Sequence, residues 1–130
     1  MALLTKEQIQ KSSDLARELV GCPKWGKDGE VYVHEVNADE YDAFERAITT
    51  DGNKRTVPHV RARLAILTVR GADGKPLFAD NDAAWLGKKG ASTLNRIMTV
   101  AMRLNGLRAE DLEELAGNSS GDQGDALPSA

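Results

Sequence analysis

The side chains best suited to covalent or metal chemistry are few in this chain of 130 residues: one cysteine, Cys22, and two histidines, His34 and His59. A nucleophilic site needs a Ser, Thr or Cys that is poised by a base. His34 falls on an expected strand and His59 on an expected helix, and neither has a recognisable partner nearby in the sequence. Cys22 precedes Pro23 at a strand end, where a small, partly buried thiol is the ordinary interpretation. We therefore expect no enzymatic activity.

The sequence also lacks the usual motifs for cofactors and metals. The glycines of GCPKWGKDG, residues 21–29, do not have the spacing of a phosphate-binding loop. One cysteine and two histidines leave a soft-metal site short of ligands. Asp80 and Asp82 are two residues apart, but the loop glycine and terminal glutamate of an EF-hand do not follow. These aspartates are better explained as a helix cap and a favourable charge at a helix start, so we expect no cofactor and no metal.

Composition and length indicate one small soluble domain. Hydrophobic residues make up 41% of the chain, which suffices for a modest core, and the net charge of −3 lacks the basic excess of most nucleic-acid binders. The start, residues 1–14, becomes polar after four residues, which argues against a signal peptide or a membrane anchor. We expect a domain over residues 1–117 and a flexible, disordered tail over residues 118–130, which are polar and rich in Gly and Ser.

The N-terminal third predicts a short helix and then a β-hairpin. Thr5 and Gln8 stand at capping-box spacing, which predicts a helix over about residues 6–12. Residues 17–36 contain two β-prone runs around a loop rich in Gly, Lys and Asp, a pattern typical of a hairpin. Because a lone hairpin is marginally stable, it must lie on helices or pair with another chain.

The remaining sequence predicts helices. Asn37 and Glu40 form a cap for a helix whose apolar stripe is Tyr41, Phe44 and Ile48. Pro58 sits near the first turn of the next helix. The inner face of that helix is expected to consist of Val60, Leu64 and Leu67.

Two further helices are expected before the last corner of the chain. Asp80 is expected to cap a short helix that ends at Gly87 and packs Trp85 inward. The clearest amphipathic helix follows, with its apolar face formed by Leu94, Ile97, Met98, Ala101 and Leu104. The fold class is thus α+β and mostly helical: a single small domain with an N-terminal β-hairpin followed by four to five helices.

The stretch RLNGLRAEDLEEL, residues 103–115, raises the question of a DNA-reading helix-turn-helix. Asn105 and Gly106 end one helix, and a second is expected over residues 109–116. A recognition helix delivers cationic and amide side chains to base edges, whereas this second helix is strongly acidic and would repel a duplex. Two interpretations remain: its leucines close the core, or its acidic, leucine-bearing face docks on another protein. A small DNA-binding regulator stays as the alternative function, using a basic set of side chains: Arg61, Arg63, Arg70, Lys88 and Lys89.

Four stretches in order resemble tail assembly chaperones of long-tailed (siphovirus-type) bacteriophages and prophages. They are MALLTKEQI, PKWGKDGEVYVHEVNADEYDAFE, VRARLAILTV with GADGKPLFADNDAAWLG, and LNRIMTVAMRLNGLRAEDLEEL. The likeness spans about residues 1–117, and the order and spacing of the stretches carry it.

The resemblance implies a non-enzymatic role in building a phage tail. Such chaperones bind the long tape measure protein, keep it soluble and help tail tube subunits assemble around it, in the cytoplasm of the infected or lysogenic bacterial host. A ribosomal frameshift gives a longer product in many phages, and this sequence would be the shorter form. We expect neither nucleic acid nor membrane as a partner, and self-association through an open hairpin edge remains open. The expected contact residues lie at the last two helices: Leu104, Leu107, Leu112, Leu115, Glu110 and Glu113.

Overall fold

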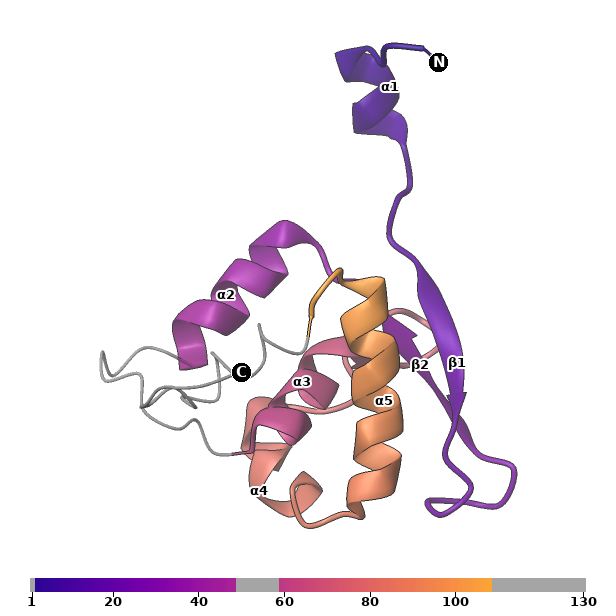
Figure 1. Ribbon diagram of the computed structural model, residues 1–130, viewed down its shortest axis with the longest axis vertical. Coiled ribbons are helices and arrows are strands. Elements are labelled where there is room, and N and C mark those ends of the chain that lie inside the picture. The colour runs from indigo at the N-terminus through magenta and orange to yellow at the C-terminus, as the bar shows by residue number, and fades with distance from the viewer. Residues whose placement is uncertain (1, 49–58, 109–130) are drawn as a thin grey trace, which may run out of the picture.

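The computed structural model describes residues 2–48 and 59–108, in which a three-stranded antiparallel sheet carries α5 and α3 on one face (Figure 1). The strands are β1 (Arg17–Gly21), β2 (Glu30–His34) and β3 (Val69–Arg70). The helical elements are α1 (Lys6–Lys11), α2 (Ala38–Ile48), α3 (Val60–Thr68), the 3-10 turn η1 (Asp80–Asp82), α4 (Ala83–Leu86) and α5 (Ala91–Leu104). The predicted α+β class, a hairpin with mostly helix after it, is confirmed.

The predicted hairpin is formed by β1 and β2, which pair from Arg17 opposite His34 to Gly21 opposite Glu30. The amide of Cys22 donates to the carbonyl of Gly29 at 2.8 Å and closes the loop between the strands. Helix α5 covers the inner face of the hairpin, as the marginal stability of an isolated hairpin requires. An exposed ion pair at 2.9 Å between Arg103 of α5 and Glu18 of β1 also links the helix to the hairpin.

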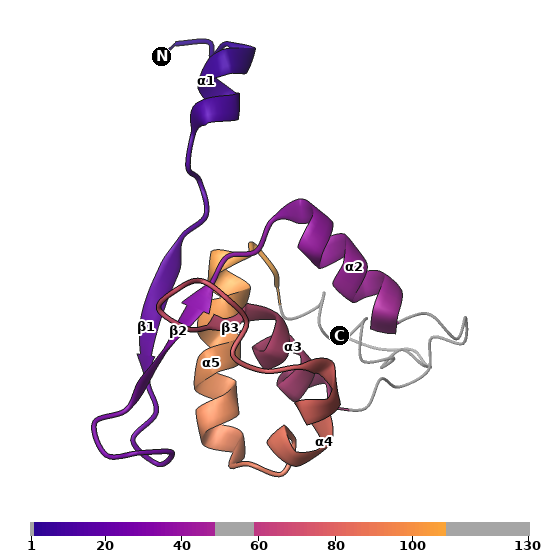
Figure 2. The same cartoon turned by 180° about the vertical axis from the view of Figure 1, so that it is seen from behind.

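The third strand was not predicted. Helix α3 runs directly into β3, whose two residues pair with β2 through Val69 opposite Val33 and Arg70 opposite Tyr32 (Figure 2). The chain then turns, and the amide of Leu77 donates to the carbonyl of Val69 at 3.2 Å. A two-residue strand is too short to produce an alternating pattern, so only its pairing with β2 defines it.

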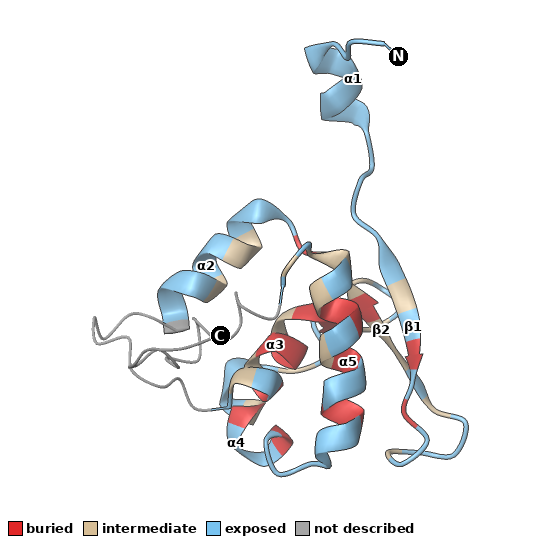
Figure 3. Ribbon diagram, in the orientation of Figure 1, coloured by how far each residue is buried: buried red, intermediate tan, exposed pale blue. Residues whose placement is uncertain are grey.

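The core lies between the sheet and the two long helices, and its buried residues gather there in Figure 3. Of the face predicted for α5, Leu94, Ile97 and Ala101 are buried, whereas Met98 and Leu104 are half-buried. The face is wider than predicted because Thr93 and Val100 are buried as well.

Helix α3 is buried around more of its circumference than the predicted face allowed. Leu64 is buried as expected, but Val60 and Leu67 are only half-buried. The remaining buried positions are Ala62, Ala65, Ile66 and Thr68. The prediction of a single inner face was wrong because α3 packs against α5, α4 and β2 from different sides, and its small alanines permit close approach. The predicted role of Pro58 lies outside the described residues.

Helix α1 stands away from the body of the molecule (Figure 1) and has no buried residue. Its predicted capping box is present: the amide of Gln8 donates to the Thr5 hydroxyl at 3.2 Å, and the amide of Thr5 donates to the Gln8 side chain at 2.9 Å. A six-residue helix without a buried residue depends on such local bonds, since helix nucleation is unfavourable in water.

Helix α5 ends in the left-handed turn that Asn105 and Gly106 predict. Gly106 has φ +67°, and the amide of Leu107 donates back to the carbonyl of Met102 at 2.9 Å, a Schellman arrangement. The Asn105 side chain also accepts from the amide of Val36 at 2.9 Å, so it joins the end of α5 to the chain that leaves β2. The helix predicted over residues 109–116 and the predicted tail over 118–130 lie outside the described residues.

Candidate partner-binding surface

The surroundings of Cys22 and His34, two of the three residues best suited to chemistry, favour the neutral form of each side chain. Cys22 is buried, and this burial raises the pKa of its thiol although the charge of Arg96 acts in the opposite direction. Burial lowers the pKa of His34, and the charges of Arg70 and Arg17 lower it further against the opposing effect of Glu40. Both groups are therefore neutral at pH 7, and the described residues contain no group of three or more His, Cys, Asp or Glu placed to hold a metal ion.

The arginines of the proposed DNA-binding surface are used within the fold. Arg70 is 15% exposed in its side chain and pairs with Glu40 of α2 at 3.1 Å. Arg61 donates to the Asn95 side chain of α5 at 2.7 Å, and Arg63 is half-buried. The predicted local basic surface is therefore not a continuous set of free cations that could follow a phosphate backbone.

The predicted contact residues at the C-terminal corner are only partly within the described chain. Leu104 is half-buried and packs against the core, and Leu107 is half-buried beside the Schellman turn. The other four predicted residues lie outside the described residues: Glu110, Leu112, Glu113 and Leu115. Their role in partner binding stays a prediction.

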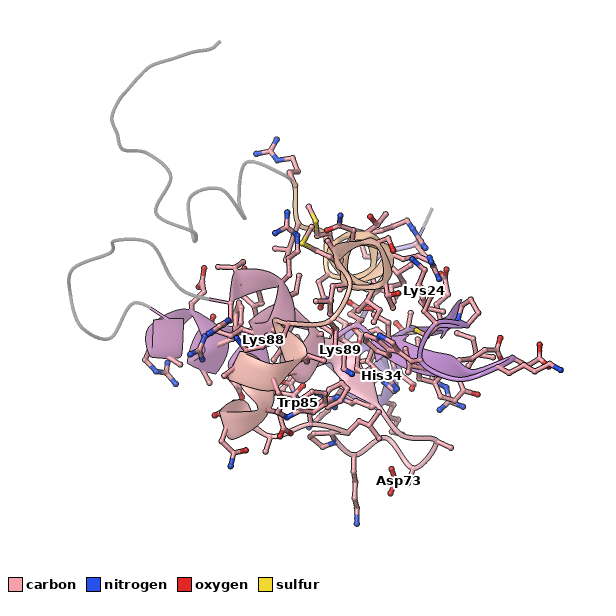
Figure 4. The ribbon with its side chains drawn as sticks, turned by 90° about the horizontal axis from the view of Figure 1, so that it is seen from below. Lys24, His34, Asp73, Trp85, Lys88 and Lys89 are labelled. Carbon is pink, nitrogen blue, oxygen red and sulfur yellow. The ribbon has the colours of Figure 1, made fainter. Side chains whose placement is uncertain are left out.

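The hairpin loop and α4 lie at the end of the molecule opposite α1 (Figure 1). A groove of about 280 Å³ is lined by both, and we name it the aromatic groove. Its lining comes from the hairpin loop, the segment after β3, α4 and the turn that follows α4. The lining residues are Lys24, Trp25, Phe78, Trp85, Leu86 and Lys89. Figure 4 views this end of the molecule, with Trp85 beside Lys89. Both tryptophans of the chain are thus in one site.

Trp85 lies at the surface of this groove, and the prediction that it packs inward was wrong. Trp85 is 46% exposed because α4 is a single turn in which Ala83 and Leu86 occupy the side that faces the core. The indole N–H donates to Asp82 at 2.8 Å, and the ring of Phe78 meets the indole edge to face at a centroid distance of 6.0 Å. Trp85 is therefore held in one orientation while much of its ring faces solvent.

Asp82, rather than the predicted Asp80, stabilises the start of this helical segment. Its second carboxylate oxygen accepts from the amide of Ala79 at 2.8 Å. The hydrogen bonds from Ala79 and from the Trp85 indole lower the pKa of the Asp82 carboxyl. The cap lies two residues later than predicted because the helix begins with a 3-10 turn whose third residue reaches back to Ala79.

Two lysines flank the aromatic rings of the groove. The ammonium of Lys24 donates a hydrogen bond to the Ser92 hydroxyl at 3.4 Å, and the ammonium of Lys89 is 5.9 Å from the centre of the Trp85 ring. Neither lysine forms an ion pair with a carboxylate among the described residues. The sequence did not reveal this site, although a tryptophan in a loop otherwise rich in Gly, Lys and Asp is a signal for one: Trp25 was treated as part of the hairpin loop.

The fold is similar to that of a phage tail assembly chaperone of known structure. The chain is similar to a solved structure described as "Structure of bacteriophage HK97 tail assembly chaperone", with a TM-score of 0.53 and 14% sequence identity. The match covers 78% of this chain and 94% of that chain. The resemblance expected from the sequence is confirmed as a common fold.

Comparisons at the level of sequence add nothing to this finding. No protein-family model matches the chain, and no curated protein matches it. Among the described residues, no helix combines the length and apolar character that crossing a bilayer demands.

Proposed function

We propose that the chain is a non-enzymatic tail assembly chaperone that binds the tape measure protein of its phage. In this role it keeps that long protein soluble and helps tail tube subunits assemble around it, in the cytoplasm of the bacterial host. The single observation that supports the proposal most strongly is the fold, which is similar to that of a tail assembly chaperone over 94% of the latter's length. A longer product made by ribosomal frameshifting belongs to the same proposal.

The surface of the molecule is consistent with a binding protein. The aromatic groove offers exposed apolar area that the fold itself does not cover, and Trp85 is the largest part of it. Aromatic side chains of this kind dominate the energetics of protein interfaces. The acidic, leucine-bearing segment over residues 109–116 is a second proposed contact with the partner. We also propose self-association through β1, which is an edge strand of the sheet.

Co-expression with the tape measure protein tests this function directly. The chain is produced together with the tape measure protein of the same phage, and the soluble fraction of that protein is compared with its soluble fraction when it is produced alone. We expect the soluble fraction to rise and the two proteins to purify together. An unrelated acidic protein of similar size serves as the control. An unchanged soluble fraction, with no co-purification, would count against the proposal.

A further inference from the structure

We infer that the aromatic groove binds segments of the tape measure protein in which a bulky apolar side chain stands beside carboxylates. This inference rests on the proposed function and adds the chemistry of the contact. It depends on three properties of the groove: exposed aromatic area, positive charge without a carboxylate partner among the described residues, and a Trp85 ring that is held in one orientation.

The apolar part of the groove fits a side chain rather than a cofactor. Its volume of about 280 Å³ lies just below the range of roughly 300–1,000 Å³ that is typical of small-molecule sites. Trp85 is 46% exposed, and Trp25 and Phe78 are half-buried at the edge of the core, so each ring presents some apolar surface to solvent. An apolar side chain placed between these rings would remove that surface from water.

The charge of the groove selects what accompanies the apolar side chain. Lys24 and Lys89 are the charged lining residues, and no carboxylate lines the groove. The whole chain has a net charge of −3, so this positive site is a local exception on an acidic protein. Carboxylates of a partner would complement the two ammonium groups, whereas the overall negative charge disfavours a long phosphate backbone.

The Trp85 ring is held in place before a partner arrives. Asp82 accepts a 2.8 Å hydrogen bond from the Trp85 indole, and the Phe78 ring contacts the indole in a T-shaped arrangement. Trp25 is attached through its backbone, whose amide donates to the carbonyl of Cys22 at 2.9 Å. Because the Trp85 side chain has little freedom left to lose, its contact with a partner costs less entropy than a contact made by a flexible side chain.

The test uses full-length variants and measures affinity for tape measure protein segments by calorimetry at low and high salt. The double variant Lys24→Glu/Lys89→Glu should bind these segments at least about tenfold more weakly, because each substitution replaces a cation with an anion that repels the carboxylates of the partner. Trp85→Ala should weaken binding by a similar factor through loss of the apolar contact. The matched control is Lys27→Glu/Lys75→Glu, which changes the same charge at exposed positions outside the groove lining and should alter affinity less than about twofold. Circular dichroism confirms that each variant is folded.

The outcomes separate the groove from the function. If the wild-type chain binds and solubilises the tape measure protein but the groove variants bind equally well, the groove inference is wrong and the proposed function stands. If the wild-type chain does not bind at all, both are wrong. If the groove variants lose only affinity for a single-stranded oligonucleotide, or only self-association, the occupant is a nucleic acid or a second copy, and the inference is overturned.

Discussion

The arginines on α3 and β3 and the lysines of the aromatic groove are both cationic, but the fold uses them in opposite ways. Arg70 joins the sheet to α2 through Glu40, and Arg61 joins α3 to α5 through Asn95. Lys24 and Lys89 flank exposed aromatic rings and have no carboxylate partner among the described residues. The cations that are available to a partner are those that the fold does not itself require.

Side-chain chemistry explains this division. The guanidinium group of Arg is planar and directs several donors at once, so it can bridge elements within a structure. The Glu40 carboxylate that receives Arg70 also accepts from the amide of Asn37 at 3.0 Å, so one carboxylate caps α2 and binds the sheet. The ammonium of Lys carries a single compact charge on a flexible stem, and its desolvation at a surface groove can be compensated by a partner.

Removal of Arg70 should have the largest effect on stability. Arg70→Met should lower the free energy of unfolding by roughly 1–2 kcal/mol, because Glu40 loses a charged hydrogen bond in a partly buried site. Urea unfolding followed by circular dichroism measures this difference.

The matched change at the groove is Lys24→Met/Lys89→Met, which should alter the free energy of unfolding by less than about 0.5 kcal/mol. Equal losses in the two variants would show that the groove lysines also support the fold, and the contrast between the two sets of cations would disappear.

Acid should lower the stability of the folded state in two steps. The pKa of His34 is lowered, so the unfolded chain takes up a proton first as the pH falls below about 6.5 and the folded state loses stability there. Burial alone would raise the pKa of Glu40, but the hydrogen bond from Asn37 and the contact with Arg70 outweigh it and lower the pKa below 4.5. The stability that Glu40 contributes is therefore present above pH 4.5 and is lost as the pH falls through its folded value.

Two variants assign these steps in urea unfolding experiments across pH. His34→Gln should flatten the dependence just below pH 6.5, and Glu40→Gln should flatten it below pH 4.5. Unchanged pH dependence in both variants would mean that neither group is linked to folding.

Local patterns in the sequence predicted the elements whose signals are local. The capping box of Thr5 and Gln8, the hairpin predicted within residues 17–36 and the turn at Gly106 each depend on a few neighbouring residues, and each is present. Strand β3 was missed because its two residues become a strand only through pairing with β2, which lies far away in the sequence.

The groove was not predicted for a similar reason. Trp25 and Trp85 are distant in the sequence, and only the packing of the hairpin loop beside α4 brings them to one site. Trp85 was assigned to the core because large apolar residues usually lie there, whereas a one-turn helix buries only one side. The charges of Arg61 and Arg70 could be counted from the sequence, but their partners on α5 and α2 could not.

Tryptophan fluorescence tests the central claim, that this groove is where the chaperone receives its partner. The chain contains two tryptophans and both line the groove, so their emission reports on the groove alone when the tape measure protein segment contains no tryptophan. Titration of such a segment into the full chain should shift the emission to shorter wavelength in a saturable manner, with a weaker response at high salt. A segment that binds by calorimetry but leaves the emission unchanged would contradict the claim.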